Sequence, residues 1–280
     1  MDWSKNEKQI WSSIEKWEQE YFTYVPTDFS RAYVRTFDEA MEKLSPKWRD
    51  KALHTIDNLL FHLHSIILNS QFQQDTKQRV LLSAQAMNAD VAVFEDIADC
   101  RIEQLRYIAQ HQVAKHRLLS FAQGGLSGAG GLLFLGIDIP ASIAAHLRSI
   151  QVIALSYGYA INQPYETMLS LKVFHAATLP KEHQQNAWEK LLSEATEPDM
   201  NPYFFDTDEV VADQQWTRHL VGLIGKGVIL FTLRKRLIQG IPLMGMVYGA
   251  AANYQLSRQI TDFANHFYQK RWLLEKHHKE

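Results

Sequence analysis

The chain has 280 residues, of which 46% are hydrophobic and 11% aromatic, and its formal net charge at pH 7 is -2. This composition indicates a folded globular protein and excludes intrinsic disorder, while the small net charge gives no overall attraction to nucleic acid or to anionic membranes. The polar N-terminal residues predict no secretory leader, and Cys100, the single cysteine, cannot form an intramolecular disulfide. We therefore expect a cytoplasmic protein.

The N-terminal third is predicted to be helical throughout. Ile10, Ile14 and Trp17 recur at helical spacing, and Pro26 ends this first helix. The aromatic residues of this helix are interpreted as core packing, with anchoring at a membrane interface as the alternative. Further helices are expected over 29–44, from Pro46 to about residue 67, and over 75–119 with an interruption near Asn88.

The second half of the chain is also predicted to be helical. Pro164 and Pro180 suit helix N-termini, because the N–H that proline lacks has no partner there. The segment 197–208 has no periodicity and is expected to form a surface loop, and the tail from His277 is expected to fray. The predicted helices cover about 139–160, 164–178, 181–196, 209–239 and 242–275. Since β-branched alternation is absent, we predict an all-α fold in one multi-helical domain.

All 13 glycines lie between Gly124 and Gly249, and most of them gather in two uncharged stretches, 118–137 and 237–257. Glycine inside a helix costs about 1 kcal/mol relative to alanine, so a compensating contact is expected. Close helix packing is the first interpretation, in two central Gly-rich helical hairpins. A membrane surface, next to the basic run 234–236, and a ligand are the alternatives. The residues of this Gly/Pro motif are Gly124, Gly128, Gly131, Pro140, Pro242, Gly245 and Gly249.

The same two stretches raise the question of a transmembrane span. Polar residues interrupt both, and they leave continuous apolar segments of about 14 residues, whereas a spanning helix needs about 20. An integral membrane protein is therefore kept as the third hypothesis.

Asp138 stands out because it is the first charge after an uncharged stretch and precedes Pro140. We expect its carboxylate to cap a helix that opens at Ile139. The alternative is a functional role, such as pairing with Arg148 or binding a polar ligand. Asn253, in apolar surroundings, is interpreted first as a buried amide that bonds across helices.

Several motifs for catalysis and cofactor binding are incomplete in this sequence. Neither Gly-rich run completes a phosphate-binding fingerprint, and the segment 125–129 lacks the strand that a nucleophile elbow requires. The acidic series Glu95, Asp99 and Glu103 is interpreted as one solvated helix face rather than a metal site, and Cys100 as a small core residue. We therefore expect no cofactor, no metal and no nucleic-acid partner, and favour a non-enzymatic role.

The order and spacing of two motifs resemble the EcsC protein family over roughly residues 75–273. The first is a Gly-rich segment followed by Asp138-Ile139-Pro140, Leu147-Arg148, Tyr157-Gly158-Tyr159 and Pro164, and the second contains Ile241-Pro242, Gly245, Gly249, Asn253, Ala264 and Tyr268. The family is named for a bacterial gene encoded beside an ABC transporter ATPase and its membrane subunit. The resemblance implies an all-helical bacterial protein without an assigned catalytic mechanism, and we divide the chain into N-terminal helices, 1–74, packed on an EcsC-like domain, 75–275.

The leading hypothesis is a non-enzymatic accessory or regulatory protein at the cytoplasmic face of the membrane, with lipid or an ABC transporter subunit as its partner. The alternative is a lipid or small-molecule binding module, or an enzyme, with a pocket between the Gly-rich helices. Its polar groups would be Asp138, Arg148, Tyr157 and Asn253. The sequence leaves the oligomeric state open.

Overall fold

The protein is built from helices, without a strand, in the part of the chain that the structure describes. The computed structural model describes residues 3–23, 70–129, 135–179, 181–196 and 242–278, and it confirms the predicted all-α class. Its elements are α1 (Lys5–Phe22), α4 (Ser70–Gln85), the 3-10 helix η1 (Phe94–Asp99), α5 (Ile102–Ala129), α6 (Leu135–Ser156), α7 (Pro164–Thr178), α8 (Lys181–Thr196) and α10 (Pro242–His278). The helices predicted over 29–44, from Pro46 and over 209–239, and the loop at 197–208, lie outside the described residues.

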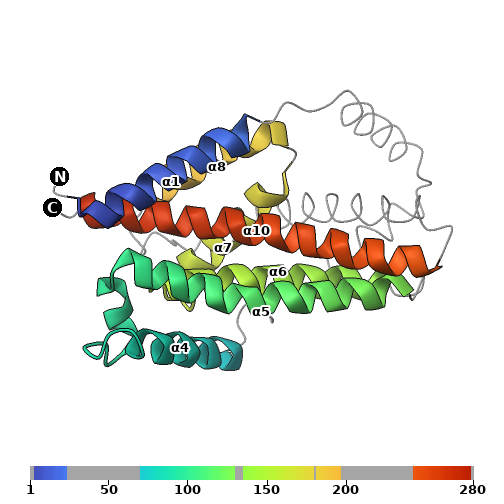
Figure 1. Cartoon of the computed structure of the whole chain (residues 1–280), viewed down its shortest axis with the longest axis horizontal. Coiled ribbons are helices and arrows are strands. Elements are labelled where there is room, and N and C mark those ends of the chain that lie inside the picture. Colours follow the sequence, from blue (N-terminus) through green and yellow to red (C-terminus); the bar gives the residue numbers. More distant parts are fainter. Residues whose placement is uncertain (1–2, 24–69, 130–134, 180, 197–241, 279–280) are drawn as a thin grey trace, which may run out of the picture.

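Three long helices, α5, α6 and α10, lie side by side at the centre of the molecule (Figure 1). The helix α10 packs along much of α5, and α6 contacts both. On one side, α1 and α8 pack against α10, and on the other side α4 packs against α5 and α6. The central helices thus carry the core, and the shorter helices cover it.

The spacing of apolar residues explains why α10 lies at the centre. Ile260, Phe263, Ala264, Phe267 and Tyr268 recur three or four residues apart and are fully buried, which is the pattern of a helix with one broad apolar face. Full burial of a phenylalanine or isoleucine side chain contributes about 1.5–3 kcal/mol. The apolar face of α10 therefore holds the other helices around it.

The first helix, α1, begins at a capping box and packs its aromatic side chains on the core. The Ser4 hydroxyl accepts a hydrogen bond from the Glu7 N–H, and the Glu7 carboxylate accepts one from the Ser4 N–H at 2.8 Å. Further along the helix, Trp17 stacks on His266 of α10 with ring centroids 4.2 Å apart. The predicted core packing of this aromatic helix is confirmed, because Trp3, Trp11, Trp17, Tyr21 and Phe22 are partly buried against the core.

The chain breaks between α4 and α5 near Asn88, as predicted. The 3-10 helix η1 fills this break, and the Asp96 carboxylate accepts hydrogen bonds from two backbone N–H groups at its start. Because α5 begins only at Ile102, the acidic residues at 95, 99 and 103 do not lie on one helix, so the predicted helical face is wrong. The predicted burial of Cys100 is confirmed.

A Schellman motif ends α6 and turns the chain into α7. The Tyr159 N–H donates to the Ala154 carbonyl, and the Gly158 N–H donates to the Leu155 carbonyl. Gly158 has a φ of +84°, and a Cβ atom there would lie 3.1 Å from the Ala98 nitrogen. This turn therefore requires glycine. Pro164 then begins α7, as predicted.

Two predictions about helix ends are wrong. The helix α6 already begins at Leu135, so Asp138 lies inside its first turns and does not cap it, and Pro140 is accommodated near the start. Proline there removes one backbone hydrogen bond close to an end where several N–H groups have no helical partner. At the other terminus α10 continues to His278, and His277 is buried with its ring stacked 4.4 Å from that of Trp3.

The structure describes four of the five glycines of the predicted Gly/Pro motif. Gly124 and Gly128 lie in α5, and Gly245 and Gly249 lie in α10, each within a continuous helix. Gly131 lies outside the described residues, so the predicted Gly-rich hairpins stay a prediction.

Among the described helices, none combines the length and the apolar character needed to cross a bilayer. The predicted domain boundary after residue 74 falls inside α4, and the division into domains also stays a prediction.

Candidate functional site

Of the four predicted ligand-binding residues, Tyr157 and Arg148 have described side chains. Tyr157 is buried at the end of α6, and its hydroxyl donates a hydrogen bond to Asn265 Oδ1 of α10 at 2.9 Å. Burial raises the pKa of Tyr157, so its hydroxyl remains neutral. The Arg148 guanidinium lies over the Phe72 ring of α4, 5.1 Å from its centroid.

The positions of these residues along their helices place them apart. At a rise of 1.5 Å per residue, Arg148 and Tyr157 are about 13 Å apart along α6, and Asp138 is about 15 Å beyond Arg148. On α10, Asn253 is about 18 Å from the residue that Tyr157 contacts. The side chains of Asp138 and Asn253 lie outside the described ones, so a shared ligand site of all four residues stays a prediction.

A buried ion pair, which the sequence reading missed, joins α7 to α10. Glu166 and Arg271 are each 5% exposed, and they form two parallel hydrogen bonds of 2.7 and 2.9 Å. Arg271 Nε also donates to Glu275 at 2.6 Å, and the Tyr159 ring covers the guanidinium at 3.9 Å. The Tyr159 hydroxyl donates to Glu275 and closes the cluster. Every charged side chain of this cluster thus has a partner within the protein, as expected for a structural link between helices.

Charged contacts also fasten α1 to the same half of α10. Glu18 accepts hydrogen bonds from Lys270 of α10 and from Trp188 Nε1 of α8, at 2.5 and 2.7 Å. Closer to the C-terminal end of α10, the Lys276 ammonium donates a hydrogen bond to the Glu7 carboxylate at 2.9 Å. The C-terminal half of α10 is therefore held by ion pairs from α1 and α7.

The opposite end of the bundle differs in charge. The last part of α5, the first part of α6 and the first part of α10 lie together at that end (Figure 1). Residues 118–129 of α5 and 242–257 of α10 contain no charge, and residues 135–147 of α6 contain Asp138 alone. We call these three segments the charge-free end. They extend about 18–24 Å along their helices.

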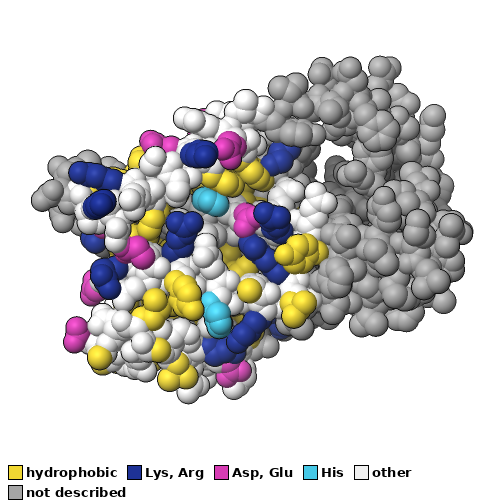
Figure 2. Space-filling model, viewed as in Figure 1, with side chains coloured by type: hydrophobic (Ala, Val, Ile, Leu, Met, Phe, Trp, Pro, Cys, Tyr) yellow, Lys and Arg dark blue, Asp and Glu magenta, His cyan; other side chains and the backbone are white. Residues whose placement is uncertain are grey.

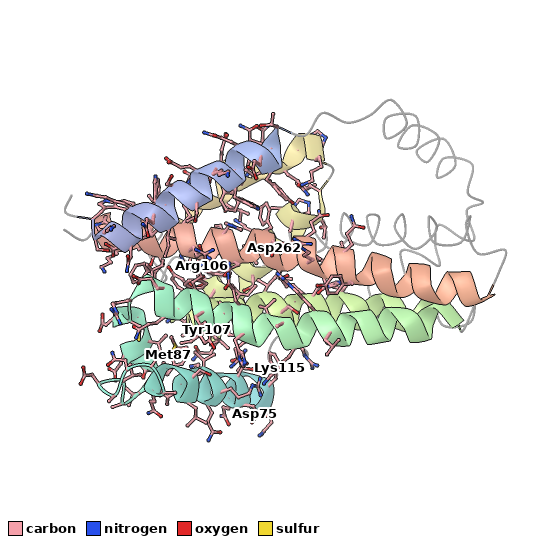
Figure 3. All side chains as sticks on the ribbon, viewed as in Figure 1. Asp75, Met87, Arg106, Tyr107, Lys115 and Asp262 are labelled. Atoms are coloured by element: carbon pink, nitrogen blue, oxygen red, sulfur yellow. The ribbon has the colours of Figure 1, made fainter. Side chains whose placement is uncertain are left out.

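Basic side chains border the charge-free end on all three helices. They are Lys115 and Arg117 of α5, Arg148 of α6 and Arg258 of α10, and we call them the basic band. Figure 3 shows Lys115 and Asp75 where α5 faces α4, and Asp262 where α10 faces α5.

Two members of the basic band share one carboxylate. Arg117 binds Asp262 at 2.6 Å and Thr261 at 2.8 Å, and Arg258 lies 3.5 Å from Asp262. In the described part of the chain, Asp262 is thus the carboxylate that contacts the basic band, and it contacts two of the four basic groups.

Exposed apolar side chains lie at the same border. Leu118 is 68% exposed and Tyr254 is 40% exposed, and each is close in sequence to an arginine of the basic band. On the face shown in Figure 2, hydrophobic side chains lie among Lys and Arg side chains next to the undescribed region. A charge-free segment bordered by tyrosine and arginine is typical of proteins that contact the membrane interface.

The described part of the chain was compared with the needs of a metal site and of a reactive thiol. Within those residues, no group of three His, Cys, Asp or Glu side chains is placed to hold a metal ion. Burial, and then the charges of Asp99 and Asp96, raise the pKa of the Cys100 thiol, which disfavours the reactive thiolate.

Comparison with known proteins identifies the family. Residues 8–273 match the EcsC protein family, and the chain therefore belongs to it. The chain is 25% identical to "Uncharacterized protein YdbA" of Bacillus subtilis (strain 168) over 265 residues, covering 94% of this chain and 91% of that protein. It is 19% identical to "Protein EcsC" of the same organism over 238 residues, covering 85% and 89%. No solved structure matches the chain.

Proposed function

We propose that this EcsC family member is a non-enzymatic accessory or regulatory protein that binds the cytoplasmic face of the bacterial membrane, near an ABC transporter. The observation that carries the proposal is the charge-free end, where segments of three helices meet and a basic band borders them. The transporter as the neighbouring partner rests on the family resemblance alone.

The dimensions of the charge-free end support partial insertion. The hydrocarbon core of a bilayer is about 30 Å thick and a full bilayer with headgroups is about 40–45 Å thick. One leaflet therefore measures about 20–22 Å, close to the 18–24 Å that the three segments extend. The bundle would enter one leaflet end-on and keep its ion-paired half in water.

The charge of the border supports an anionic surface as the binding partner. Each Lys or Arg near an anionic leaflet contributes about 1 kcal/mol of attraction. The net charge of the whole chain, -2, gives no such attraction. Binding therefore depends on the local excess of basic groups in the basic band rather than on the average charge.

Flotation with vesicles tests the proposal. We expect the purified protein to float with vesicles containing 30% phosphatidylglycerol, and to do so less with pure phosphatidylcholine vesicles. Addition of salt weakens the binding because it screens the basic band. A protein that stays at the bottom of the gradient with both vesicle types contradicts the proposal. Fractionation of cells, with and without a high-salt wash, checks the same property in vivo.

The lipid or small-molecule binding module is retained as the second candidate because of one buried hydroxyl. Ser257 is fully buried at the edge of the charge-free segment of α10, and its Oγ atom has no hydrogen-bond partner in the described part of the chain. A buried donor without a partner costs about 1–3 kcal/mol, and a ligand oxygen could satisfy it. Native mass spectrometry of the purified protein tests this candidate, since a bound molecule of defined mass favours it over a purely surface-binding protein.

A further inference from the structure

We propose that Arg148 binds the phosphate group of an anionic phospholipid, with the Phe72 ring holding its guanidinium in place. This inference rests on the proposed function, because it assigns one residue of the basic band to the lipid headgroup. It concerns a specific contact, whereas the proposed function requires only attraction of the band as a whole.

Arg148 differs from the other arginines of the basic band in its partners. Arg117 and Arg258 both contact Asp262, which neutralises part of their charge. Among the described residues, no carboxylate forms an ion pair with Arg148, and its Nε atom is buried without a hydrogen-bond partner. Its side chain as a whole is partly exposed. Arg148 therefore keeps a full charge and unused donors at the border.

The contact with Phe72 leaves these donors available. The ring lies over the guanidinium, with the central carbon 5.1 Å from the ring centroid. A cation–π contact of this kind uses the charge of the guanidinium and none of its N–H groups as hydrogen-bond donors to an oxygen. Two of them can bind two oxygens of one phosphate group in parallel, the geometry in which arginine binds phosphate best. The aromatic ring thus reduces the freedom of the side chain without occupying its donors.

The depth of Arg148 matches the level of the phosphates. It lies about 20 Å from the start of α6 at Leu135, and Arg117 lies about 18 Å from the end of α5. Half of a bilayer with its headgroups measures about 20–22 Å. If the charge-free end fills one leaflet, Arg148 reaches the layer where the phosphate groups are.

The test compares Arg148→Gln with Arg106→Gln in binding to vesicles with 30% phosphatidylglycerol. Arg106 is a matched control, because it is also a partly buried arginine without a carboxylate partner among the described residues, and it lies about 17 Å from Arg117 on the side away from the charge-free end. We expect Arg148→Gln to weaken vesicle binding about ten-fold and Arg106→Gln less than two-fold. Thermal unfolding of both variants controls for loss of structure.

The outcomes separate the two proposals. If the unaltered protein binds and both variants bind equally well, the role of Arg148 is wrong while the proposed function stands. If the unaltered protein binds neither vesicle type, both are wrong.

A second measurement follows Arg148 by NMR in the unaltered protein. The Nε–Hε resonance of Arg148, assigned with the Arg148→Lys variant, is followed while soluble dihexanoyl-phosphatidylglycerol is added to the unaltered protein. We expect a saturable shift with this lipid and none with the same concentration of inorganic phosphate. An unmoved resonance overturns the assignment, and an equal shift with inorganic phosphate overturns the lipid as its source.

Discussion

The two ends of α10 differ in their charge and in the contacts that they make. Its C-terminal half places Arg271, Lys270 and Lys276 against carboxylates from α7 and α1, and these contacts tie together helices that are far apart in the sequence. Its N-terminal part, residues 242–257, contains no charge and lies beside a part of α5 without charge and a part of α6 in which Asp138 is the single charge. We infer that stability is concentrated at the first end and that contact with a surface is the task of the second.

Removal of the Arg271 side chain should give the largest effect, at the ion-paired end. In Arg271→Ala the Glu166 carboxylate stays buried without its partner, and the loss of one member of a buried pair costs about 3–5 kcal/mol of unfolding free energy. Urea unfolding measures it. Lys190→Ala, whose side chain is 78% exposed, serves as the control and should change stability by less than about 0.5 kcal/mol. A small effect of Arg271→Ala would contradict the division of tasks between the two ends.

The turn after α6 should be the next most sensitive position. In Gly158→Ala the new Cβ meets the backbone of Ala98, and the residue must keep a positive φ. The strain costs about 1–3 kcal/mol, and it also displaces Tyr159 from the Arg271 guanidinium. Urea unfolding of Gly158→Ala measures the loss, and an unchanged midpoint would show that this turn does not support the ion-paired end. Ser156→Ala, in the last turn of the same helix, is the control for a small change nearby.

The contact of α1 with α10 should depend on pH through Glu7. Burial raises the pKa of Glu7, but hydrogen bonds from Lys276 and Ser4 outweigh it and lower the pKa to about 2. Since the folded pKa is below the unfolded value of 4.5, Glu7 stabilises the protein above pH 4.5, and this contribution is lost as the pH falls from 4.5 toward 2. Because the Lys276 side chain is 46% exposed, we expect only about 1–2 kcal/mol.

The measurement for Glu7 is a comparison of urea unfolding between the unaltered protein and Glu7→Gln. The difference in unfolding free energy should be full at pH 6 and should shrink below pH 4.5. A difference that stays constant down to pH 2.5 would mean that Glu7 does not titrate with the folded state, and α1 would then be held by its aromatic contacts alone.

The smallest effect on stability, with the largest effect on binding, is expected at the border of the charge-free end. Leu118→Asp and Tyr254→Asp change side chains that are already exposed, so unfolding free energies should change by less than about 0.5 kcal/mol. Each adds a negative charge beside the basic band, so flotation with anionic vesicles should decrease several-fold. Leu82→Asp, at a leucine of α4 that is 58% exposed, is the control. Equal binding by all three variants would argue against this end as the membrane contact.

The local signals in the sequence were sufficient for most helix ends and insufficient for two of them. Pro164 correctly predicted the start of α7, and the polar residues near Asn88 correctly predicted the break before α5. At Asp138 the proline signal misled, because α6 begins at Leu135, before Pro140, and continues through the proline. At His277 the prediction of fraying failed because Trp3, from the other end of the chain, covers the ring.

The buried ion pair shows what a single sequence leaves out. Glu166 and Arg271 are 105 residues apart, and nothing local joins them. A signal was nevertheless present, because Arg271 follows Phe263 and Phe267 at intervals of four and therefore lies on the apolar face of α10. A charge in that position requires a buried partner. The basic band was equally hidden, since its members become neighbours only when the three helices are placed side by side.

The stacking of Trp3 on His277 has a practical consequence for distance measurements. It brings Trp3 and His277 together at one pole of the described part, at the end of a helix that extends about 55 Å from its first residue. A fluorophore attached to either terminus would therefore report the height of that pole above a labelled bilayer, without touching the residues proposed to enter it. An upright molecule would give weak energy transfer from both termini, and a molecule lying flat would give strong transfer from both.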